Sequence, residues 1–126
     1  MILHKLHFVL LAGSLLGVGC SAIDPTDATV CTLEARAGIT VDVRDSVTNA
    51  LVGRGSVVVA REGTFAETAS DTQISNGPYA LVFERAGNYT VTVTQTGYQP
   101  WTKAGVVVAK DGCHVTGVAV TARLQK

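Results

Sequence analysis

Alternation of apolar and polar residues with a period of two is the feature that most constrains the fold of this chain. It is clearest in residues 89–94, which read Tyr-Thr-Val-Thr-Val-Thr, and it recurs in residues 39–44, which read Ile-Thr-Val-Asp-Val-Arg. Successive side chains of a strand point to opposite faces of a sheet, so each segment is predicted to be a strand with one buried face.

Five further segments are expected to form strands, namely 56–61, 64–71, 79–84, 105–109 and 114–124. Turn sequences separate them, and no segment after residue 20 has a helical stripe of useful length. A strand that is apolar on one face needs a second sheet to cover that face. The sequence therefore predicts one all-β, Ig-like or transthyretin-like Greek-key β-sandwich of about seven strands, after an N-terminal signal helix.

The first 20 residues predict export. Lys5 supplies one fixed positive charge, residues 8–18 form an uncharged apolar run, and Gly19 precedes Cys20. This is the layout of a secretory signal peptide, and the run is too short to span a membrane. It also resembles the lipobox of bacterial lipoproteins, whose cysteine receives a diacylglycerol, although the usual leucine three residues earlier is replaced by Gly17. The resemblance implies lipidation at Cys20, with a plain secreted protein as the alternative.

The expected organisation is a lipoprotein signal peptide in 1–19, a lipid-anchored tether in 20–36 and one β-sandwich domain in 37–126. The tether contains no periodic pattern. Ser21 follows Cys20, which in a bacterium with two membranes resembles the signal for sorting to the outer membrane. The predicted location is the bacterial cell envelope, with the lipid as the contact to the membrane.

The other two of the three cysteines are Cys31 and Cys113. An even pair in an exported chain favours a structural disulfide over reactive or metal-binding thiols. Cys31 precedes the first expected strand and Cys113 begins the last one, so such a bond ties together the two ends of the domain.

Three segments carry a family resemblance. Residues 38–43 read Gly-Ile-Thr-Val-Asp-Val, residues 84–93 read Glu-Arg-Ala-Gly-Asn-Tyr-Thr-Val-Thr-Val, and residues 97–101 read Gly-Tyr-Gln-Pro-Trp. The stretch 38–124 resembles the carboxypeptidase regulatory-like domains, which have a transthyretin-like, prealbumin-type sandwich. The resemblance implies a domain that accompanies other domains and serves folding, spacing or binding, and it carries over no catalytic residue.

Charge and motif content argue against several functions. Ten Lys and Arg balance ten Asp and Glu, and no basic run is present, so nucleic acid is not an expected partner. His114, the one histidine after the leader, is interpreted as an ordinary strand residue. With two cysteines it supplies too few ligands for structural zinc, and neighbouring strand residues such as Cys113 and His114 point to opposite faces, which does not suit a Cys-His hydrolytic site. Asp42, Asp45 and Asp71 are interpreted as turn carboxylates rather than calcium ligands. No enzyme activity, metal or cofactor is expected.

Tyr98 and Trp101 are the candidate ligand contacts. Exposed rings on either side of Pro100 could stack on a sugar, whereas buried rings would only close the corner of the sandwich, which is the favoured interpretation. The sequence thus predicts a non-enzymatic envelope lipoprotein whose sandwich is a structural or binding accessory module. The alternative is a carbohydrate- or peptide-binding module that uses Tyr98 and Trp101 or an exposed edge strand, with a glycan or an envelope protein as its partner.

Overall fold

The computed structural model of the 126-residue chain describes residues 29–70 and 76–126. The expected signal helix, Cys20 and Asp71 lie outside these residues. Within the described part, no helix has the length and apolar character that crossing a membrane requires. The described residues form eight strands: β1 (Ile39–Asp45), β2 (Val57–Glu62), β3 (Phe65–Ser70), β4 (Tyr79–Leu81), β5 (Gly87–Thr94), β6 (Trp101–Lys110), β7 (Val115–Thr116) and β8 (Val118–Leu124).

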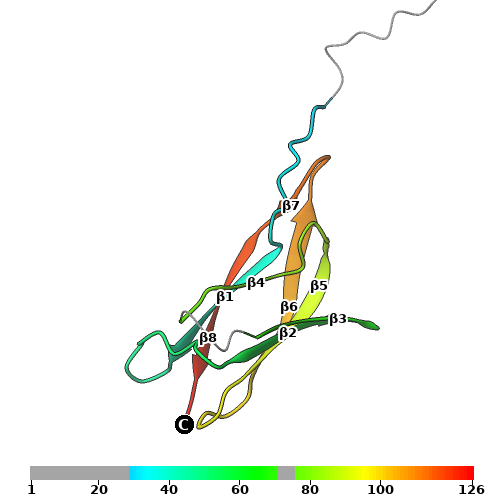
Figure 1. Ribbon diagram of the computed structural model, residues 1–126. Coiled ribbons are helices and arrows are strands. Elements are labelled where there is room, and N and C mark those ends of the chain that lie inside the picture. The colour runs from blue at the N-terminus through cyan, green and yellow to red at the C-terminus, as the bar shows by residue number, and fades with distance from the viewer. Residues whose placement is uncertain (1–28, 71–75) are drawn as a thin grey trace, which may run out of the picture.

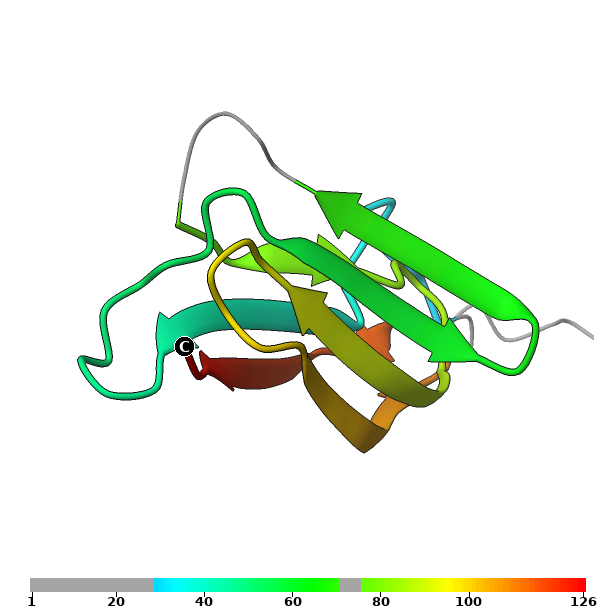
Figure 2. The same ribbon diagram turned by 90° about the horizontal axis from the view of Figure 1, so that it is seen from below.

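The strands form two sheets that pack face to face, which confirms the predicted β-sandwich (Figures 1 and 2). One sheet has the order β4-β1-β8 and the other the order β3-β2-β5-β6-β7. All pairs are antiparallel except β1 with β8, which run parallel from Ile39↔Val118 to Asp45↔Leu124. The first strand of the domain is therefore held beside the last one.

The core lies between the sheets and consists of the residues that the period-two alternation places on one face. Ile39, Val41 and Val43 of β1 are fully buried, and so are Tyr89, Val91 and Val93 of β5. The polar residues between them are exposed or half-buried. Because the two apolar faces cover each other, the alternation alone predicted which side chains of these strands are buried.

Three expected strands differ from the structure by more than two residues in their bounds. The segment expected as one strand over 114–124 is divided by Gly117 into β7 and β8, which belong to different sheets and bring the total to eight. The strand expected over 79–84 ends at Leu81, because Val82 and Glu84 have φ values of 51° and 52°, outside the β region. The strand expected over 105–109 begins earlier, at Trp101.

The lengthened strand β6 contains a β-bulge. Its pairing with β5 shifts between Tyr89↔Val106 and Val91↔Lys103, and Gly105 has a φ of 70°. A glycine takes up this left-handed conformation without a steric penalty, which lets β6 continue past the extra residue.

Different segments of the chain meet at the two ends of the sandwich (Figure 1). At one end, called the disulfide end here, residues 29–36 approach the turn between β6 and β7. At the opposite end, called the C-terminal end, the chain ends beside the β5–β6 loop, where the backbone N–H of Gln99 donates to the carbonyl of Gln125 at 2.7 Å.

Candidate functional site

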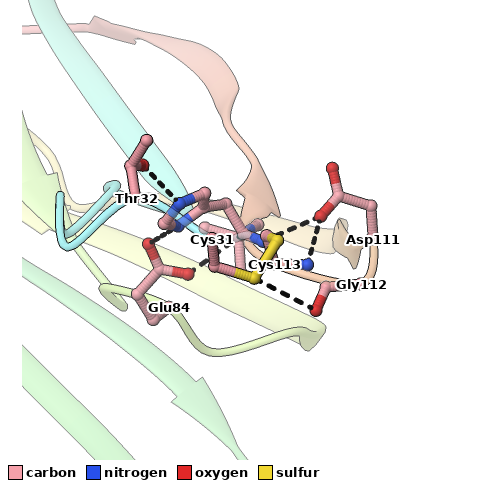
Figure 3. Close-up of a disulfide and its surroundings, with 8 residues drawn as sticks. Cys31, Thr32, Glu84, Asp111, Gly112 and Cys113 are labelled. Atoms are coloured by element: carbon pink, nitrogen blue, oxygen red, sulfur yellow. Dashed lines mark hydrogen bonds and ion pairs between the residues drawn. A yellow bond between two sulfur atoms is a disulfide. The ribbon is translucent and has the colours of Figure 1, made fainter. Parts of the chain in front are cut away.

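The disulfide end is held by the predicted bond between Cys31 and Cys113, which the structure contains (Figure 3). The two cysteines are 82 positions apart in the sequence, and their Cα atoms are 5.3 Å apart. Cys113 lies in the turn after β6, and Cys31 lies in the exposed segment that leads into β1. The bond thus fastens the N-terminal segment to the rim of the five-stranded sheet.

His114 is buried and forms hydrogen bonds with two distant segments, whereas the sequence predicted an ordinary strand residue. It lies just before β7 with 8% of its surface exposed. Its Nδ1 is 2.7 Å from Oε1 of Glu84, and its Nε2 is 2.9 Å from Oγ1 of Thr32. An ionised carboxylate only accepts hydrogen bonds, so Nδ1 donates to Glu84, and in the neutral ring Nε2 accepts from the threonine hydroxyl.

The Glu84 carboxylate connects two segments that are distant in the sequence. Besides His114, it accepts the backbone N–H of Arg36 at 2.8 Å and that of Val115 at 3.3 Å. These bonds, that from Arg36 first, hold the pKa of Glu84 below its ordinary value because they favour the charged carboxylate. Glu84 lies in the loop after β4 with a left-handed φ of 52°, and its carboxylate contacts the N-terminal segment at Arg36.

The order hydroxyl, imidazole and carboxylate in Thr32, His114 and Glu84 is that of a nucleophile with its general base. Acyl transfer also needs hydrogen-bond donors around the developing oxyanion. The backbone N–H groups of residues 113–115 are already bonded to the carboxylates of Asp111 and Glu84. The hydrogen bonds of Thr32 and Arg36 join the N-terminal segment to this cluster, which is called the clamp here.

Asp111 holds the turn of the same clamp. Its Oδ1 accepts the N–H groups of Cys113 at 2.7 Å and His114 at 2.8 Å. The bond from His114 is the larger cause and that from Cys113 the next, and together they lower the pKa of Asp111.

At the C-terminal end, Tyr98 is half-buried and bonded to the core rim. Its hydroxyl donates to Oδ2 of Asp45 at 3.1 Å, and its ring lies 5.6 Å from the ammonium of Lys126. Asp45 also accepts the N–H groups of Thr48 and Val47 at 2.9 Å each. These two backbone bonds, with that of Thr48 the larger cause, lower the pKa of Asp45 to about 2.

Trp101 is also half-buried, and its cross-strand partner on β5 is the buried Val93. It lines a hollow of about 310 Å³ together with Gln99, Pro100, Thr102, Arg123 and Gln125. Tyr98 lines a different hollow, between β2 and the end of β5. The two aromatic residues that the sequence grouped together therefore do not form one surface, although Pro100 touches both hollows.

Sequence reasoning missed Glu84, Arg123, Gln99 and Gln125. No local pattern marks them, since each acquires its partners only when distant strands meet. Among residues 29–70 and 76–126, no group of three or more His, Cys, Asp and Glu side chains is placed to hold a metal ion.

The chain matches no protein-family model and no curated protein.

Proposed function

We propose that this chain is a non-enzymatic lipoprotein of the bacterial cell envelope, in which one carboxypeptidase regulatory-like β-sandwich acts as a structural or binding accessory module. Cys20 carries the lipid in this proposal. Two or three acyl chains hold a protein firmly on a membrane, at about 0.8 kcal/mol per buried CH₂ group. The lipid is inserted in the outer membrane if the host has two membranes.

The observation that carries the proposal is the Cys31–Cys113 disulfide. Such bonds persist in oxidising compartments outside the cytosol, which agrees with the export signal in residues 1–19. Cys31 also lies in the segment that follows Cys20. In this proposal, a force applied to the domain through the tether therefore acts on a covalent crosslink at the rim of the domain. Only the disulfide end then faces the membrane, and the C-terminal end points away from it.

The family assignment is supported by where the resembling residues fall. Residues 39–45 form the central strand β1 of the small sheet, and residues 87–94 form β5 at the centre of the large sheet. The two segments that carry most of the resemblance thus each contribute three fully buried side chains to the core. A binding role, beyond a spacing role, is favoured by the polar hollow beside Trp101 at the C-terminal end.

The test is the intact mass of the protein isolated from bacterial membranes, with and without reductant. The expected mass begins at Cys20, includes acyl chains, and increases by two hydrogens on reduction. The Cys20→Ala variant is expected to keep its leader, and Ser21→Ala serves as a control that is still acylated. A soluble protein without lipid, cleaved at another residue, contradicts the anchor.

A further inference from the structure

The hollow beside Trp101 lies between strands of the two sheets. One wall is the start of β6 with the loop before it, and the other is the end of β8, where Arg123 and Gln125 lie. Between residues 101 and 108, the second edge of β6 pairs with no other strand of the described chain. The hollow thus opens at the C-terminal end, opposite the tether.

Trp101 offers a fixed ring and a donor. Its packing against the core holds the ring in place. Its indole N–H makes no hydrogen bond to the described residues, and no side-chain nitrogen or oxygen buried among them lacks a partner, so this N–H is open to solvent. A rigid aromatic side chain with one polar tip is suited to a ligand that has apolar faces and hydroxyl groups.

The remaining lining is polar and carries one positive charge. Arg123 is exposed, and its Nη1 donates to Oδ1 of Asn49 at 2.7 Å, which positions the guanidinium. The other donors of this fork have no partner among the described residues. Gln99 and Gln125 add amide groups, of which the Gln99 Nε2 donates to the main-chain oxygen of Lys126 at 3.3 Å, and no Asp or Glu side chain lines the hollow. Such a lining is complementary to a ligand with hydroxyl groups and a carboxylate.

A peptide strand added to β6 fits less well. The bulge at Gly105 interrupts the row of backbone groups on this edge, and the exposed Lys103 lies beside it. Bulges and edge lysines are devices that prevent strand addition. Only a short run of β6 precedes the bulge, so the side chains that line the hollow are the main source of ligand recognition.

We propose that the hollow formed by Gln99, Trp101, Arg123 and Gln125 binds an acidic saccharide, with Trp101 against the sugar ring and Arg123 on its carboxylate. This inference deepens the proposed function, because an envelope module anchored at its disulfide end presents this hollow to its surroundings.

Trp101 is the single tryptophan of the chain, so its fluorescence reports directly on the hollow. The experiment titrates the full chain, purified from the cell fraction where it accumulates, with an oligomer of galacturonic acid and with a neutral glucose oligomer of equal length. Fluorescence and calorimetry are recorded together. We expect saturable binding of the galacturonate oligomer and at least about tenfold weaker binding of the neutral one, since a hydrogen bond to a charged group is lost.

The variants separate this site from its neighbours. Arg123→Gln is expected to weaken galacturonate binding about tenfold or more, and Gln125→Ala to weaken it severalfold. Arg61→Gln removes the same charge from the exposed face of β2 and is expected to change nothing. Tyr98→Phe is also expected to bind normally, because Tyr98 lines the other hollow.

Three results overturn the proposal. They are no saturable response to galacturonate, equal affinity for the neutral oligomer, and full binding by Arg123→Gln. A response to a penta-alanine peptide without a response to either sugar would assign the site to strand addition instead. If the purified chain carries no lipid but binds the galacturonate oligomer, the lipid anchor is refuted and the saccharide site is still supported.

Discussion

Removal of the Cys31–Cys113 disulfide is expected to cost a large part of the stability of the domain. The bond joins residues 82 positions apart, so in the unfolded chain it closes a loop that includes strands β1 to β6. The chain-entropy relation for a loop of this length gives about 4.5 kcal/mol. A domain of about 90 residues has a total unfolding free energy of roughly 5–14 kcal/mol.

The structure indicates that most of this cost arises in the unfolded state. Cys31 is exposed and lies outside the core, so few packing contacts depend on it. The hydrogen bonds from Thr32 to His114 and from Arg36 to Glu84 do not involve the cysteines, and we expect them to remain when the bond is absent. The Cys31→Ser/Cys113→Ser variant is therefore expected to keep its native fold while its unfolded chain gains conformational freedom.

The assay is urea unfolding of the oxidised protein, the reduced protein and the double variant, followed by circular dichroism and by Trp101 fluorescence. With a urea dependence of about 1–3 kcal/mol per molar, the midpoint should fall by roughly 1.5–4.5 M. The reduced protein and the double variant should have the same midpoint, because both lack the loop. A loss below about 1 kcal/mol would refute the entropic argument for this bond, which gives about 4.5 kcal/mol.

Three further predictions concern the sandwich itself. The folded-state pKa of Asp45, about 2, lies below its ordinary value of 3.8. The contribution of Asp45 to stability is therefore full above pH about 4 and is lost as the pH falls toward 2. The Asp45→Asn variant should flatten this part of the curve of urea midpoint against pH. Gly38→Ala should destabilise the fold by about 1–3 kcal/mol in thermal melts, since its Cβ would lie 2.8 Å from a backbone oxygen; Gly112→Ala, with no atom within 4 Å of the new Cβ, should have little effect. Val91→Ala should cost about 2 kcal/mol in urea unfolding, because Val91 is fully buried, whereas Val107→Ala, at a site 60% exposed, should change it by less than about 0.5 kcal/mol. Equal effects within either pair would contradict the assigned packing.

Much of the fold was predictable because its information is local. The alternation in residues 39–44 and 89–94 identified the buried side chains of β1 and β5, since the period of a strand fixes which residues share a face. The even number of cysteines outside the leader predicted the disulfide. Turn sequences gave the approximate limits of most strands.

The candidate sites were less predictable. Tyr98 and Trp101 are close in the sequence, yet the corner between β5 and β6 sends them to separate hollows. Glu84 reads as the end of a strand, and its role follows from partners at residues 36, 114 and 115. His114 was predicted to be an ordinary strand residue because its two partners, Thr32 and Glu84, are distant from it in the sequence.

By itself, the sequence determined that this chain forms strands, which of their faces are buried, and that two cysteines pair. These properties depend on the nature of neighbouring residues and on composition. Only the tertiary structure decided that residues 114–124 serve both sheets, that β8 lies parallel to β1, and that Arg123 meets Trp101 across a hollow. The physical reason is that alternation specifies a face to be covered but not the strand that covers it, so long-range pairing selects one register among many.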